Sequence, residues 1–265
     1  MSLLIEIQYF PPIISYATLI KSNHIDFSIY ENYRRRSFRN RCIIAGANGL
    51  ISLSIPIAGG RNQKKVFGEV RIDYSVDWQQ QHWRSIFSAY GKSPWFFHYA
   101  DSLEKLFSQK IDLLVDWNRH CLNWINETLE QKMELLAPGF LENQSTLGGL
   151  GTPGESSDTW KVGEPLEGSG TFGDLSQRWR VGKFLEGVKE SEKFNRERAG
   201  EFDKEILDWR DRILPANYQD PGFGPFPVYT QVFEDRFGFQ PNLSILDFVL
   251  CSGKGQLNKL LAYPV

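Results

Sequence analysis

Apolar residues near the N-terminus form a continuous run and then recur with helical spacing. Leu3 to Phe10 is rich in apolar, β-branched and aromatic residues, which predicts a strand. Pro11 and Pro12 open the segment Ile13 to Ile20, which is predicted to be a helix because proline is tolerated in a first helical turn. The free N–H groups at such a strand-to-helix junction would favour an anion.

A hairpin is predicted around Asn48-Gly49. This dipeptide suits a type I′ turn, and it separates the apolar runs Cys42 to Gly46 and Leu50 to Ile57. Alternating apolar and polar residues predict another strand over Ile25 to Tyr30, and Val66 to Tyr74 is expected to be one more. The first 75 residues are therefore expected to form a small sheet with one early helix.

The pattern after Tyr74 is mainly helical. Asp77 can cap a helix that runs to Tyr90 and stops at Gly91. Further helices are predicted over Pro94 to Phe107, Ile111 to Leu136, Glu190 to Arg212, Tyr229 to Phe237 and Leu243 to Cys251. This order predicts an α/β protein, with α+β as the alternative: a small N-terminal mixed sheet with an early helix, followed by a mainly helical remainder.

Glycine accumulates between residues 144 and 187, where a nine-residue segment starting at Trp160 recurs 19 residues later at Trp179. Two copies are too few for a solenoid. We expect an N-terminal α/β core with a helical extension (residues 1–143), a loosely ordered, glycine-rich insertion (144–187) and a helical C-terminal part that packs on the same core (188–265). Gly149 to Gly154 matches the letters of a dinucleotide fingerprint, but no strand precedes it and Pro153 would obstruct the helix that should follow.

Composition excludes several classes of protein. The net charge of −2 and the isoelectric point near 6.1 argue against a nucleic-acid partner. The sequence has no apolar run of membrane-spanning length and no signal-peptide pattern, so we expect a cytoplasmic protein without a membrane span. Three isolated cysteines and no convincing ligand spacing predict no metal, and we expect no cofactor. Nothing in the pattern indicates an oligomeric state.

The segment Tyr33 to Arg41 holds five arginines in nine residues. Guanidinium groups can bind phosphate or carboxylate in a bidentate manner, although a solvated basic turn would show the same pattern. The following apolar residues predict a strand that would hold Arg39 to Arg41 on a rigid frame. His82 is also ambiguous, because it shares a helix face with apolar residues and suits either a buried core position or a catalytic one.

The chain resembles the WbqC-like family over roughly residues 3–110 and 225–263. The resemblance is carried by Gln8-Tyr-Phe-Pro-Pro with Tyr16, by Arg39-Asn40-Arg41, by Trp78 and His82 with Ile86, Tyr90, Pro94 and Phe96, and by Leu243-Ser-Ile-Leu-Asp247. Pro12, Ser15 and the long insertion depart from the family pattern. Members occur among bacterial genes for O-antigen and other surface polysaccharides, so the resemblance implies a glycyl or aminoacyl transfer to an amino sugar.

These observations lead to the hypothesis of a cytoplasmic transferase that acts on a phosphorylated small molecule, such as a sugar nucleotide. His82 would accept a proton and Asp247 would orient the imidazole, although Asp247 would equally suit the first turn of a helix. The expected substrate-binding residues are Gln8, Tyr9, Arg39, Asn40, Arg41 and Tyr90. The alternative is a binding or assembly protein without catalysis that recognises the same ligand.

Overall fold

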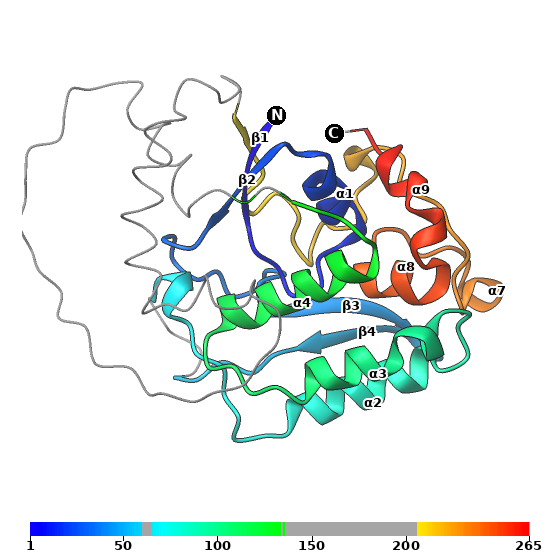
Figure 1. Cartoon of the computed structure of the whole chain (residues 1–265), viewed down its shortest axis with the longest axis horizontal. Coiled ribbons are helices and arrows are strands. Elements are labelled where there is room, and N and C mark those ends of the chain that lie inside the picture. Colours follow the sequence, from blue (N-terminus) through cyan, green and yellow to red (C-terminus); the bar gives the residue numbers. More distant parts are fainter. Residues whose placement is uncertain (60–64, 134, 136–205, 265) are drawn as a thin grey trace, which may run out of the picture.

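The computed structural model describes residues 1–59, 65–133, 135 and 206–264 (Figure 1). The glycine-rich insertion predicted over residues 144–187, with its repeat, lies outside the described residues. Among those described, the chain forms two small sheets surrounded by helices (Figure 1). The expectation of an α/β protein is confirmed.

The first sheet has three parallel strands, β1 (Ser2–Glu6), β2 (His24–Ser28) and β5 (Ile206–Asp208), in the order β2-β1-β5. Ser2 is in register with His24 on one side and with Ile206 on the other. The helix α1 (Ile13–Lys21) connects β1 to β2. All three strands therefore end at the same edge of the sheet, with β1 in the middle.

The start of α1 is closed by the C-terminal part of the chain. The N–H of Ile13 donates to the carbonyl of Leu243 over 2.9 Å, and the N–H of Ile14 donates to Oδ1 of Asn242, also over 2.9 Å. Two of the N–H groups that were expected to attract an anion are therefore already bonded within the protein. An anion site has to be sought elsewhere.

The second sheet is the predicted hairpin, which consists of β3 (Arg41–Gly46) and β4 (Gly49–Ser54). The turn itself consists of Ala47 and Asn48, and Asn48 has no positive φ, so the type I′ turn expected at Asn48-Gly49 is wrong. Gly49 follows the turn with a φ of 117°, a conformation that favours glycine. The strand predicted over Val66 to Tyr74 is wrong: this segment forms the short helix η1 (Phe67–Glu69) and isolated pairings such as Ile57 with Ile72. The first 75 residues thus contribute to two sheets instead of one.

The remaining elements are mostly helices, and α2 agrees closely with its prediction because Asp77 accepts a hydrogen bond from the N–H of Gln80 over 3.3 Å. In Figure 1, α2 and α3 run beside the hairpin. The α-helices are α2 (Trp78–Tyr90), α3 (Phe96–Phe107), α4 (Leu114–Thr128), α7 (Glu234–Phe237), α8 (Ile245–Ser252) and α9 (Asn258–Leu261), and the other short helices are η3 (Pro221–Phe223) and η4 (Lys254–Gln256).

A continuous hydrophobic core joins the N-terminal strands to the C-terminal helices. The helix predicted over Glu190 to Arg212 is wrong for residues 206–212, of which 206–208 form β5 and 209–212 a turn, while residues 190–205 lie outside the described part of the chain. Ile206 and Leu207 form a strand because β1 offers them an open edge, which local sequence does not reveal. Among the described residues, no helix is both long and apolar enough to cross a membrane.

Candidate functional site

An acidic residue follows or ends each strand of the parallel sheet. Glu6 is the last residue of β1, Glu31 comes three residues after β2, and Asp211 comes three residues after β5. The chain passes from β1 to β2 on one side, while β5 lies on the other side of β1. Ligands of α/β proteins bind at this kind of switch point, beyond the carboxyl ends of the strands.

Arg39 lies between these acidic groups and is fully buried. Its Nη1 donates to Oδ1 of Asp211 over 2.6 Å, and its Nη2 donates to Oε1 of Glu31. The guanidinium also lies 5.5 Å from the centre of the Phe67 ring. Arg34 approaches the second oxygen of Asp211 at 3.2 Å.

Glu6 binds the other residues of this group through both of its oxygens. Oε1 accepts a hydrogen bond from Nε2 of Gln8 over 2.7 Å, and Oε2 accepts one from the N–H of Asp211 over 2.9 Å. Asp211 has a φ of 52°, which is uncommon for a residue other than glycine. We call Glu6, Gln8, Glu31, Arg34, Arg39 and Asp211 the edge cluster; its hydrogen bonds connect the ends of all three strands.

The carboxyl groups of the edge cluster differ in their protonation behaviour. Burial raises the pKa of Glu6, although the positive charge of Arg39 opposes the shift. Burial also raises the pKa of Glu31 against the effect of Arg39. Burial would raise the pKa of Asp211 too, but hydrogen bonds and charges from Arg39 and Arg34 bring it below its usual value. Glu31 therefore combines a raised pKa with a side chain that is 20% exposed.

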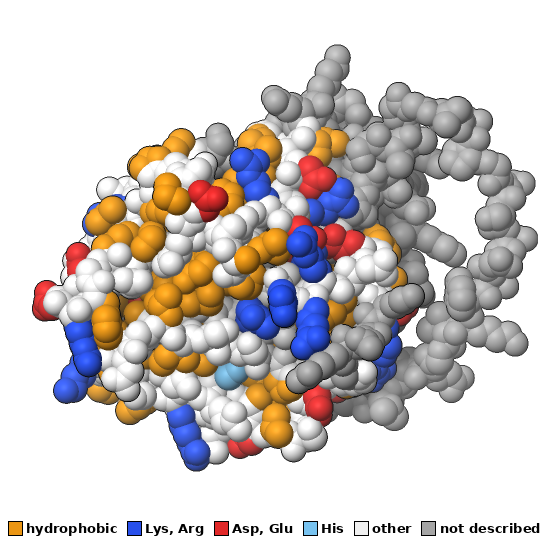
Figure 2. Space-filling model, turned by 180° about the vertical axis from the view of Figure 1, so that it is seen from behind, with side chains coloured by type: hydrophobic (Ala, Val, Ile, Leu, Met, Phe, Trp, Pro, Cys, Tyr) orange, Lys and Arg blue, Asp and Glu red, His pale blue; other side chains and the backbone are white. Residues whose placement is uncertain are grey.

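Exposed arginines precede Arg39 in the same loop. The side chain of Arg34 is 50% exposed, and Arg35 and Arg36 are exposed and form no ion pair with any described residue. Arg41, at the start of β3, is half-buried, and its Nε has no hydrogen-bond partner in the described part of the chain. On the face seen in Figure 2, Lys and Arg side chains gather beside acidic ones and an apolar stretch. An anion could therefore bind here to cations that pair with no acidic group in the described part of the chain.

His82 and Tyr9 lie in the core, away from solvent. The hydroxyl of Tyr9 and Nδ1 of His82 form a hydrogen bond over 2.9 Å, and the imidazole also bonds to the backbone of Ser54. Burial lowers the pKa of His82 to about 4, so the ring is neutral near pH 7. The imidazole is therefore already bonded within the protein, through Nδ1 to Tyr9 and to the backbone of Ser54.

Asp247, in the first turn of α8, is a fully buried carboxylate whose pKa is raised by burial. Its Oδ1 accepts a hydrogen bond from the hydroxyl of Tyr90 over 2.6 Å, and its Oδ2 accepts bonds from the hydroxyl of Tyr229 and from Nε2 of Gln231. We call these four residues the Asp247 network. The structure thus brings together the predicted residues Tyr90 and Asp247, but it shows no hydrogen bond between Asp247 and His82.

The predicted site residues therefore occupy separate places. Gln8 and Arg39 belong to the edge cluster, and Asn40 donates from Nδ2 to the carbonyl of Ile55 over 2.9 Å.

Sequence reasoning missed Glu6, Glu31 and Asp211. An acidic residue directly after an apolar run was the available signal for Glu6, whereas Asp211 could be found only once residues 206–208 were known to be a strand.

A metal site is not apparent in the described residues, where no group of three His, Cys, Asp or Glu side chains is arranged to hold an ion.

The fold and the edge cluster together define an α/β protein with charged groups at the carboxyl edge of a parallel sheet. The model of the WbqC-like protein family matches residues 8–145, which are 138 of 265 residues, and the chain belongs to this family. No curated protein and no solved structure matches the chain.

Proposed function

We propose that this protein is a cytoplasmic transferase of bacterial surface-polysaccharide biosynthesis of the O-antigen type. It passes a glycyl or other aminoacyl group to the amino sugar of a sugar nucleotide. The observation that carries the proposal is the edge cluster at the switch point of the parallel sheet, next to exposed arginines. Membership of the WbqC-like family supports the substrate class.

In this proposal only some of the arginines contact the bound anion. Arg35 and Arg36 are exposed and form no ion pair with a described residue, so they contact the phosphates directly. Their planar guanidinium groups suit phosphate oxygens better than a point charge would. Arg39 does not contact the phosphates, because Glu31 and Asp211 already neutralise its charge.

The proposed reaction is an attack by the amine of the sugar on the carbonyl carbon of an activated aminoacyl donor. A C–N bond forms, the bond between that carbon and the leaving group of the donor breaks, and the proton of the amine passes to a base. Among the edge-cluster carboxylates Glu31 suits this task best, because Glu6 is buried and the pKa of Asp211 is lowered. His82 is a weaker choice, because it is buried, its Nδ1 is bonded to Tyr9 and its pKa is about 4.

The binding step is tested with the double variant Arg35→Gln, Arg36→Gln. We expect at least about tenfold weaker binding of UDP-glucosamine by calorimetry, a smaller difference from the parent at high salt, and a nearly unchanged melting temperature, since exposed charges contribute about 0 to 1 kcal/mol to stability. Arg84→Gln, at an exposed position on α2, is the control and should bind normally. Equal binding by the double variant and the parent would remove these arginines from the site.

The alternative function is a binding protein without catalysis, and the engagement of His82 and Asp247 within the core favours it. Glu31→Gln separates the two functions. A transferase should keep UDP-glucosamine binding and lose most of its turnover with glycyl donors such as a glycyl thioester or glycyl adenylate. A binding protein should yield no aminoacylated sugar with these donors, either as the parent or as the variant.

A further inference from the structure

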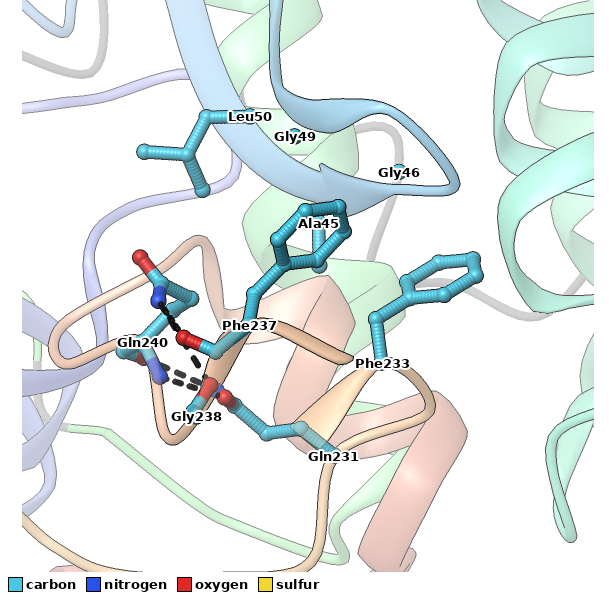
Figure 3. Close-up of a pocket in the computed structure, with 9 residues that line it drawn as sticks. All are labelled: Ala45, Gly46, Gly49, Leu50, Gln231, Phe233, Phe237, Gly238 and Gln240. Atoms are coloured by element: carbon cyan, nitrogen blue, oxygen red, sulfur yellow. Dashed lines mark hydrogen bonds between the residues drawn. The ribbon is translucent and has the colours of Figure 1, made fainter. Parts of the chain in front are cut away.

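A cavity of about 150 Å³ lies between the tip of the hairpin and the segment 231–240 (Figure 3). Ala45 and Leu50 line it from the hairpin, and Phe233 and Phe237 line it from the facing segment. Leu50 and Phe237 remain 44% and 39% exposed, so the cavity reaches the surface. It takes no part in the edge cluster.

The two walls of this cavity are connected to the same buried carboxylate. The N–H of Ala45 donates to the hydroxyl oxygen of Tyr90 over 3.1 Å, and Tyr90 in turn donates to Asp247. On the opposite wall, Nε2 of Gln231 donates to Asp247 over 3.1 Å. Arg236 adds a bond from its guanidinium to the carbonyl of Ala47. The cavity is therefore held open by a defined network instead of resulting from loose packing.

The size and the rim of the cavity indicate the ligand. An apolar cavity of about 150 Å³ can hold a single six-membered ring. The side-chain oxygen of Gln240 points toward Leu50 in Figure 3 and accepts no hydrogen bond from a described residue. An acceptor at the rim of an apolar cavity matches the ring N–H group of a pyrimidine such as uracil.

The hairpin also provides a route from this cavity to the arginines. Arg41 and Ala45 lie on one face of β3, and Ser52 and Leu50 lie beside them on β4. Four strand steps separate Arg41 from Ala45, which is about 14 Å, and the arginine side chain covers part of this distance. A ribose would then pass over Ser52, with the diphosphate at Arg41.

We propose that this cavity is the base-binding subsite of the protein and that it takes the uracil ring of a uridine diphosphate sugar. The inference rests on the proposed function, because it assigns the two ends of one ligand: the base at the hairpin tip and the sugar at the edge cluster. Phe233 and Phe237 supply the apolar contact, while the side-chain oxygen of Gln240 binds the polar edge of the ring.

The experiment compares ligands that carry or lack the base. UDP-glucosamine should bind at least about tenfold more tightly than glucosamine 1-phosphate and ADP-glucosamine in calorimetry. Leu50→Trp, which places a large ring at the mouth of the cavity, should weaken binding of UDP-glucosamine about tenfold and leave glucosamine 1-phosphate unchanged. Gln240→Leu should reduce the preference for uracil over adenine. Val228→Trp changes an exposed residue that does not line the cavity, and it is the control.

The outcomes separate this inference from the proposed function. The base subsite is wrong if UDP-glucosamine and glucosamine 1-phosphate bind equally and neither Leu50→Trp nor Gln240→Leu has an effect. The proposed function still stands in that case if the Arg35, Arg36 double variant weakens the binding of both ligands. If uridine binds and Leu50→Trp abolishes its binding, while the arginine variant binds UDP-glucosamine like the parent, the subsite stands and the proposed anion site fails.

Discussion

The edge cluster and the Asp247 network both bury a charged group, but they compensate it in opposite ways. Arg39 is fully buried and is paired with Glu31 and Asp211, whose side chains are 20% and 26% exposed. Asp247 is fully buried and accepts hydrogen bonds from two hydroxyl groups and one amide, all of them neutral. One region therefore balances charge with charge, and the other uses neutral donors only.

This difference separates a site that a ligand can reach from a network that fixes geometry. The carboxylates around Arg39 stay partly in solvent, so a bound anion can alter how their charges are balanced. The Asp247 network is closed to solvent, and its position in the first turn of α8 favours a negative charge. In the proposed function the edge cluster is the place for chemistry, whereas the Asp247 network connects the hairpin to the C-terminal segment.

The largest effect is expected for Arg39→Met. This change leaves the buried Glu6 and the half-buried Glu31 without their cation. Removing one partner of a buried pair typically costs about 3 to 5 kcal/mol. Urea unfolding measures the loss. Arg34→Met, which removes the half-exposed partner of the same Asp211, is the control and should cost at most about 1 kcal/mol. Similar values for the two variants would mean that the cluster is not a buried charge system.

A smaller effect is expected for His82→Gln, which removes a ring that bonds to Tyr9 and Ser54. Unsatisfied buried partners should cost about 1 to 3 kcal/mol near pH 7, while activity per folded molecule should persist. A variant that folds with normal stability and has lost its turnover would instead identify His82 as the base.

The pH dependence of stability gives His82 a second test. Its pKa is about 4 in the folded protein and near 6.5 when unfolded, so the unfolded state binds the proton first as the pH falls. The contribution of the neutral, buried imidazole to the free energy of unfolding is complete above pH 6.5. It is lost between pH 6.5 and 4, by up to about 3 kcal/mol. The stability difference between the parent and His82→Gln should therefore shrink over this range. A constant difference would show that the imidazole does not titrate as a buried group.

The smallest effect is expected for Asp247→Asn. The hydroxyls of Tyr90 and Tyr229 can rotate to suit an amide, so the network should accept a neutral isostere at a cost of about 1 kcal/mol. Asp247→Leu, which removes every acceptor, should cost clearly more in the same urea experiment. A loss of several kcal/mol in the asparagine variant would show that the network needs the negative charge itself.

Part of the site followed from the sequence. Gln8 and Arg39 do lie in the edge cluster, and Tyr90 and Asp247 do meet, although in a different network. The resemblance to the WbqC-like family identified these positions, but not which residues each side chain would contact. Glu31 stands only eight residues from Arg39, yet no periodic pattern signals a bond between two loop residues.

The sequence alone determined that a hairpin joins the two apolar runs near Asn48 and that Asp77 caps a helix, because turn and capping preferences depend on neighbouring residues. Tertiary structure decided the rest. β5 becomes a strand because β1 offers it an edge, and Arg39 is neutralised by Asp211, which lies 172 residues further along the chain. Contacts over such separations depend on the packing of the whole core, and they leave no local signal in the residues that make them.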